Sequence, residues 1–217
     1  MFLGHYAVAL AAKRLTPATS LGTLFAAGAC LDLIWPVLVI MNVERVVIEP
    51  GITAFTPLNF EHYPYSHSLL MSALWGLLFA AGYYLYKRST KAAMVVGALV
   101  ISHWLLDAVV HRPDLPITLQ ETTLVGLGLW NSVTATLVVE LVLFAICIAL
   151  YMQVTRADDR IGGMGLVAFI IFLLMIYAGA AFGPPPPGAR AVAWSGLGQW
   201  LIVALAAWID RHRQMTN

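Results

Sequence analysis

The chain has 217 residues, of which 60% are hydrophobic and only 11% are charged. A soluble domain carries about 25% charged residues, so this composition excludes an ordinary soluble protein and predicts a polytopic membrane protein. The formal net charge of +1, without any basic stripe, excludes a nucleic-acid-binding protein.

The amino-terminal third begins with a short apolar stretch. Residues 2–12 are too few to cross a ~30 Å hydrocarbon core at ~1.5 Å per residue, so we expect a half-helix that is re-entrant or interfacial. The next run, residues 18–43, is long enough to span. It carries Asp32 near its middle, and Pro36 predicts a kink one turn later. A polar, proline-containing connection follows over residues 44–65.

Five more apolar runs are long enough to cross a bilayer. They cover residues 66–86, 91–111, 131–154, 161–182 and 191–209. The sequence therefore predicts an all-α fold with about six transmembrane helices plus the short amino-terminal half-helix. We expect a single integral membrane domain over residues 1–217, with supporting helices at about 130–210.

Basic residues fix the expected orientation, because they cluster in alternate connections. These are Lys13 and Arg14, the 87–91 turn, the 156–160 turn and the 211–213 tail. By the positive-inside rule, these connections and the carboxyl terminus face the cytoplasm. We expect a multi-pass protein of the bacterial inner membrane, with the lipid bilayer as its main partner.

Ionisable side chains interrupt the apolar runs in a recurring pattern. His103, Asp107 and His111 are spaced four residues apart, which places them on one face of a helix. With this topology, His5, Asp32 and His67 are expected in the same, outer half of the membrane. Three further residues, Asp114, Glu61 and Glu140, are candidates for supporting or general-base roles. Unpaired ionisable groups at such depth cost several kcal/mol, so they usually have a function.

A divalent cation would satisfy several of these side chains at once. Imidazole and carboxylate ligands suit Zn²⁺, Mn²⁺ or Fe²⁺, and we expect zinc. The ligand set comprises His5, Asp32, His67, His103, Asp107 and His111. More than four ligands would suit one or two ions, with Asp107 as the expected bridging carboxylate. No cysteine cluster exists, which excludes a Cys-type structural zinc site.

The order of these residues resembles a known family. His5, Asp32, the segment from His62 to Ser68 (His-Tyr-Pro-Tyr-Ser-His-Ser), and His103-Trp-Leu-Leu-Asp107 resemble the bacterial membrane-bound metal-dependent hydrolases. That family is distantly similar to zinc-dependent phospholipase C. The resemblance covers about residues 1–115, which we expect to form the metal-site half. Residues 31–33 read Leu-Asp-Leu where the family has Pro-Asp-x-Asp, which leaves the number of ions open.

Together, the ligand set and the resemblance predict an enzyme that hydrolyses an ester or phosphoester, with a lipid as one candidate substrate. Asp107, His111, Asp114 and His62 are the candidate catalytic acids and bases, and Arg112 the candidate substrate clamp. We expect the tryptophans, including Trp35 and Trp130, to serve in membrane belts and packing.

Two other classes use similar residues. A metal or proton transporter, or an assembly factor, would use the same cluster as a binding site, although few polar residues continue below Asp32. A haem protein with two axial histidines is a weaker alternative. A membrane di-iron oxygenase is disfavoured, because the sequence has no His-x-x-His-His box.

Overall fold

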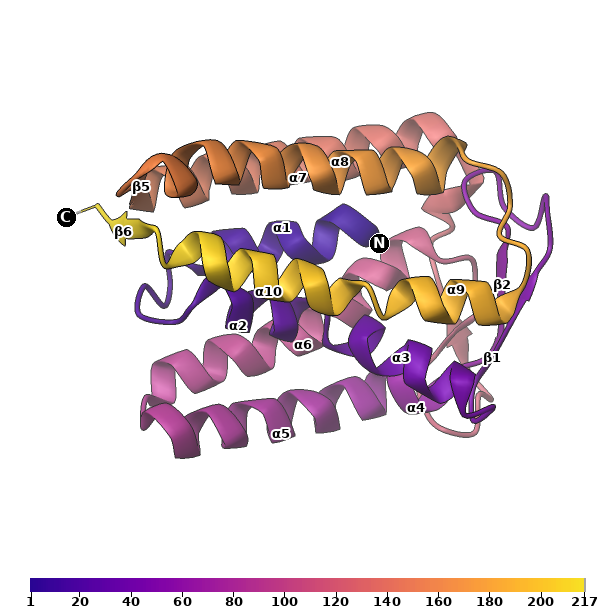
Figure 1. The fold of residues 1–217 in the computed structure, drawn as a ribbon. Coiled ribbons are helices and arrows are strands. Elements are labelled where there is room, and N and C mark those ends of the chain that lie inside the picture. The colour runs from indigo at the N-terminus through magenta and orange to yellow at the C-terminus, as the bar shows by residue number, and fades with distance from the viewer. Residues whose placement is uncertain (217) are drawn as a thin grey trace.

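The computed structural model of the chain describes residues 1–216 and is helical apart from three small antiparallel ribbons (Figure 1). Five helical segments are long and apolar enough to cross a membrane, and a bent helix pair would make a sixth. The predicted all-α fold class is therefore confirmed. The long segments are α5 (Leu69–Lys87), α6 (Thr90–Val110), α7 (Val133–Val154), the turn η2 (Ile161–Gly165) continued by α8 (Leu166–Phe182), and α9 (Ala189–Gly196) followed by α10 (Gln199–Asp210).

Serine side chains start three of these helices. The hydroxyls of Ser68, Ser89 and Ser132 accept hydrogen bonds from the backbone N–H groups three residues ahead, at the first turns of α5, α6 and α7. Such caps satisfy backbone donors that a helix leaves free at its amino end. The helices therefore begin close to the residues that the sequence predicted.

Helix α1 (Phe2–Ala12) is the predicted half-length helix, but it lies inside the bundle and not at an interface. Most of its side chains are buried, and it packs against α2, α6, α7 and α8. Figure 1 shows the amino terminus near the middle of the bundle. The first turn of α1 therefore brings its side chains to the protein interior.

The first span is broken into α2 (Leu21–Gly28) and α3 (Cys30–Ile40), which meet at an angle of 57°. The bend lies at Ala29, so the predicted kink at Pro36 is wrong: Pro36 sits within α3. The Asp32 carbonyl, which lacks an i+4 N–H donor because Pro36 has none, instead has the side-chain amide of Gln199 3.5 Å away. The break places Asp32 in the first turn of α3.

Connections at one end of the bundle form a cap. Strands β1 (Arg45–Ile48) and β2 (Leu58–His62) pair there, followed by the short helix α4 (Pro64–His67). The ribbon of β3 (Leu115–Pro116) and β4 (Leu124–Val125) and the 3₁₀ turn η1 (Leu129–Asn131) complete this β1–β2 end. At the opposite end, β5 (Thr155–Ala157) pairs with β6 (Arg213–Met215).

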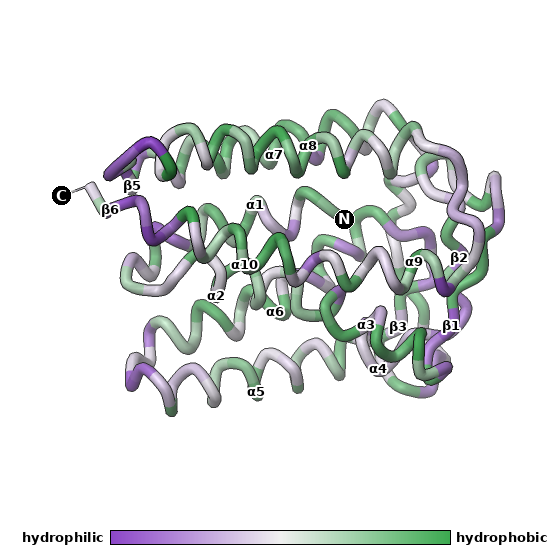
Figure 2. Tube along the Cα trace, viewed as in Figure 1, coloured by the Kyte–Doolittle hydropathy of each residue, from purple (hydrophilic) through white to green (hydrophobic). Residues whose placement is uncertain are grey.

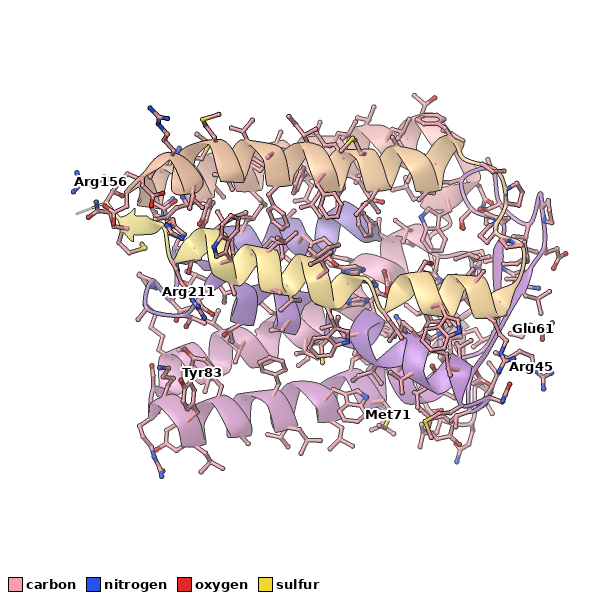
Figure 3. All side chains as sticks on the ribbon, viewed as in Figure 1. Arg45, Glu61, Met71, Tyr83, Arg156 and Arg211 are labelled. Carbon is pink, nitrogen blue, oxygen red and sulfur yellow. The ribbon has the colours of Figure 1, made fainter. Side chains whose placement is uncertain are left out.

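The two ends differ in charge as the sequence predicts. Figure 3 shows Arg156 and Arg211 at the β5–β6 end and Arg45 with Glu61 at the β1–β2 end. Between the ends, the helices are mainly hydrophobic (Figure 2). Apolar side chains such as Leu77 on α5 and Val138 on α7 point outward and are more than half exposed. This surface is suited to contact with lipid.

Candidate metal centre

The break in the first span provides the first contact of the site. The carbonyl of Gly28, at the end of α2, lies 2.8 Å from Nδ1 of His103 on α6. A carbonyl only accepts, so Nδ1 of His103 carries the proton. The Nε2 atom of the ring then faces the protein interior, where it is buried without a hydrogen-bond partner among residues 1–216.

A relay of three side chains orients His67 in the same way. The hydroxyl of Ser66 donates to Glu44 at 2.6 Å and lies 2.7 Å from Nδ1 of His67. Because the single hydroxyl proton goes to Glu44, Nδ1–H of His67 is the donor to Ser66. Glu44 also accepts the backbone N–H of Ser66 at 2.8 Å. Burial raises the pKa of Glu44, against the opposing effect of these two Ser66 hydrogen bonds.

The Nε2 atoms of His67 and His103 face two carboxylates, and the four side chains form a closed ring of alternating nitrogen and oxygen atoms. His67 Nε2 lies 3.5 Å from Asp32 Oδ1 and 3.8 Å from Asp107 Oδ2. His103 Nε2 lies 3.8 Å from Asp32 Oδ1 and 3.2 Å from Asp107 Oδ2. We call these four residues the His/Asp ring.

His5 of α1 joins the ring from the other side of Asp107. Its Nε2 lies 3.1 Å from Asp107 Oδ1, and its imidazole stacks on that of His103 with the centroids 3.5 Å apart. The amino group of Met1 lies 2.5 Å from the same Oδ1 atom. The two oxygens of Asp107 thus face different histidines, as a bridging carboxylate would.

The donor atoms fit a divalent cation. Two groups of three residues, His5–His103–Asp107 and Asp32–His67–His103, have ligand atoms within 4.8 Å of one another. At zinc–nitrogen and zinc–oxygen distances of about 2.0–2.1 Å, neighbouring ligands of a tetrahedral ion lie about 3.3 Å apart, close to the spacings in the His/Asp ring. The buried ring nitrogens of His5 and Nε2 of His103 have no hydrogen-bond partner in the described part of the chain. Buried polar atoms are rarely left in this state, and a cation would satisfy one nitrogen of each ring.

His111 lies apart from both groups. Helix α6 ends at Val110, so His111 adopts an extended backbone as its C-cap and does not continue the predicted stripe of His103 and Asp107. Its Nδ1 lies 2.9 Å from Asp114 Oδ1, and Tyr63 contacts both residues at 3.3 Å. Burial, followed by the charge of Asp114, raises the pKa of the Tyr63 hydroxyl well above its ordinary value. His111 is thus held by Asp114 and lines the cavity beside the ring.

Arg112 and His62 lie outside that cavity. Arg112 binds Asp114 at 2.9 Å and Asn59 at 2.5 Å, and faces a separate surface hollow. Its guanidinium therefore positions Asp114. The imidazole of His62 pairs with Glu121 at 2.7 Å and is 41% exposed. Neither residue reaches the His/Asp ring, which differs from the clamp and acid–base roles that the sequence suggested.

A cavity of about 180 Å³ adjoins the His/Asp ring. Asp32, His67 and Asp107 form its polar side. Glu140 of α7 also lines it: one oxygen accepts the backbone N–H groups of Leu3 and Gly4 at 2.7 and 3.2 Å, and the other oxygen is buried without a partner among residues 1–216. Glu140 therefore holds the first turn of α1, and with it His5, against the cavity.

Sequence reasoning missed the residues that support the ligands. In the sequence, Glu44 is only one charge in a polar connection, and the Gly28 carbonyl carries no side-chain signal at all. Trp35 and Trp130 both line the cavity. Only Ser66 could have been recognised from the sequence as a supporting residue. It directly precedes the candidate ligand His67, and a neighbouring hydroxyl can orient an imidazole by a hydrogen bond.

No protein-family model matches this chain, and neither a curated protein nor a solved structure matches it.

Proposed function

We propose that the His/Asp ring, together with His5, binds one or two divalent cations, most suitably zinc, and that the protein hydrolyses an ester or phosphoester. The observation that carries this proposal is the pair of imidazoles whose Nδ1 atoms contact the Ser66 hydroxyl and the Gly28 carbonyl, so that their Nε2 atoms face two carboxylates. The Met1 amino group contacts only Asp107, so a dication would offset the negative charge that the two carboxylates still leave in this site. A bound dication lowers the pKa of its water and stabilises negative charge on a reacting oxygen.

The chain's own residues supply the remaining functions. Asp32, His67, His103 and Asp107 hold the ion, and His5 approaches Asp107 from the side of α1. His111, held by Asp114 through Nδ1, lines the cavity and serves there as a proton donor or acceptor. The apolar walls of the cavity exclude water from the reacting group, which strengthens each electrostatic interaction there.

The proposed location is the bacterial inner membrane, with the β5–β6 end and the carboxyl terminus in the cytoplasm. The basic residues gathered at that end support this orientation. The His/Asp ring then opens toward the outer leaflet or periplasm, on the side of the β1–β2 end.

A metal transporter is the second candidate, and the broken span favours it. Discontinuous helices often form ion sites in transporters, because their ends expose backbone groups near the middle of the membrane. Between the ring and the β5–β6 end, however, Leu21, Leu24 and Phe25 of α2 are fully buried. These apolar side chains offer an ion no ligand in that part of the bundle, so we place hydrolysis first.

Elemental analysis of purified protein tests the site. We expect about one or two equivalents of zinc in the wild type, a loss in His103→Ala and Asp107→Ala, and no change in the surface control His62→Ala. Hydrolysis of bis(p-nitrophenyl) phosphate and p-nitrophenyl butyrate should follow the metal content. A wild-type protein without metal would refute the proposal, whereas zinc flux into liposomes without hydrolysis would select the transporter.

A further inference from the structure

Two tryptophans in the cavity beside the His/Asp ring have no hydrogen-bond partner in the described part of the chain. The indole nitrogens of Trp35 on α3 and Trp130 on η1 are buried, and no group of residues 1–216 accepts from them. An indole N–H is a donor only, so it cannot be satisfied by any neighbouring donor. Tryptophan N–H groups usually find an acceptor when they are buried.

The other two buried polar atoms in this cavity can satisfy each other in principle. The free oxygen of Glu140 accepts, and the hydroxyl of Tyr177 donates. The two indoles have no such complement among the described residues. Elsewhere in the chain, the Trp75 N–H donates to the Tyr65 carbonyl at 2.9 Å, and the Trp104 N–H donates to the Pro116 carbonyl at 3.1 Å. Both tryptophans with unpaired indoles line the cavity.

Aromatic packing fixes both indoles in place. The Trp130 ring lies 4.3 Å from that of His111 and 6.3 Å from that of Phe60, and the Trp35 ring lies 5.5 Å from that of Phe60. Phe60 thus lies between the two tryptophans and holds them against one cavity. Donors held in advance bind an acceptor at little cost in conformational entropy.

A second, larger hollow lies next to the cavity and shares part of its wall. This space of about 460 Å³ lies between residues 50–58 and the segment around Pro184–Pro186. It shares Phe55, Thr56, Leu58 and Ala180 with the walls of the first cavity. An apolar chain that extends past Phe55 from polar oxygens beside the ring would reach this hollow.

We propose that the Trp35 and Trp130 indoles are positioning residues that donate to the oxygens of an amphipathic ester or phosphoester, whose apolar chain occupies the hollow beyond Phe55. This inference rests on the proposed function, because it names the substrate class of the same site. The ligand is recognised by acceptor oxygens at one end and hydrocarbon at the other. In this arrangement, a single head group provides both sets of oxygens: some coordinate the ion, and others accept hydrogen bonds from the two indoles.

Binding of a non-hydrolysable ligand tests the inference separately from catalysis. Hexylphosphonate carries three acceptor oxygens and a chain, and its C–P bond resists hydrolysis. We expect it to bind the zinc-loaded protein, with affinity lowered about three- to tenfold by Trp35→Phe and by Trp130→Phe, since each change removes one hydrogen bond. Trp104→Phe is the matched control, because this indole is also buried but donates outside the cavity, and it should leave the affinity unchanged.

Two further arms separate the sources of binding. Inorganic phosphate and methylphosphonate should bind at least tenfold more weakly than hexylphosphonate, on the order of what the missing chain contributes. Equal affinity of wild type and both indole variants for hexylphosphonate would overturn the inference, as would phosphate binding as tight as hexylphosphonate binding. If the indole variants bind normally while zinc and hydrolysis persist, only this inference fails. If the wild type holds no metal, the proposed function fails. The hexylphosphonate affinities of the wild type, Trp35→Phe and Trp130→Phe are then compared on the metal-free protein.

Discussion

The carbonyl oxygen of Gly28 accepts a hydrogen bond from Nδ1 of His103 at 2.8 Å, which links the break in the first span to the orientation of a candidate metal ligand. A continuous helix would direct this carbonyl to its own i+4 N–H group. Because α2 ends here, the carbonyl is free to fix the tautomer of His103. Such support of a metal-binding histidine by a backbone carbonyl is common, and its loss typically weakens metal binding.

Gly28→Ala tests this link. A Cβ atom at Gly28 would lie 2.7 Å from the carbonyl oxygen of His5, so α1 and α2 would have to separate. We expect a lower Tm and a weaker zinc affinity, measured by thermal unfolding in detergent and by competition with a chromogenic chelator. Gly82→Ala is the control, because a methyl group added there would meet no atom of residues 1–216 within 4 Å, and it should leave both values unchanged or raise the Tm slightly. Equal zinc affinity in the two variants would contradict the link.

The relay through Ser66 yields a second prediction. Ser66→Ala removes the acceptor for Nδ1–H of His67 and leaves Glu44 without its 2.6 Å partner. We expect zinc affinity to fall about 10- to 100-fold, the usual effect of removing such a supporting group. Ser72→Ala is the matched control: Ser72 is equally buried, but its hydroxyl donates to the Ser68 carbonyl, away from the ring. If both serine variants bind zinc like the wild type, His67 does not depend on the relay.

The fold and the centre of the site were predictable from local patterns, whereas their supporting contacts were not. His103 and Asp107 lie on one face of α6, as their i, i+4 spacing predicts, because helix periodicity depends only on nearby residues. The same rule wrongly placed His111 on that face, because α6 ends at Val110 and the position of a helix end depends on how the following segment leaves the bundle. The break at Ala29 and the burial of Glu44 depend on packing between segments far apart in the chain. No local rule places a loop carboxylate beside a serine 22 residues later.

Glu140 provides a prediction about stability. Its carboxylate accepts two backbone N–H groups at the start of α1, so Glu140→Leu would leave both buried donors unpaired. Each unpaired donor costs about 1–3 kcal/mol, and we expect a loss of about 2–5 kcal/mol in the free energy of unfolding. Glu140→Gln keeps an acceptor oxygen and should lose much less. Denaturation in mixed micelles measures both variants, and equal stability of the two would show that Glu140 does not hold α1.

The pairing of His111 with Asp114 distinguishes a proton-transfer residue from a metal ligand. His111→Gln should lower kcat about 10²- to 10⁴-fold, the usual contribution of a general acid or base, while the zinc content stays at the wild-type value. Asp114→Asn should have the same but smaller effect, because the amide holds Nδ1 of His111 less well than the carboxylate at 2.9 Å. His62→Gln, at a surface histidine paired with Glu121, should leave kcat unchanged. Loss of zinc in His111→Gln would instead make His111 a ligand, as the i, i+4 spacing suggests, and an unchanged kcat would remove it from the reaction altogether.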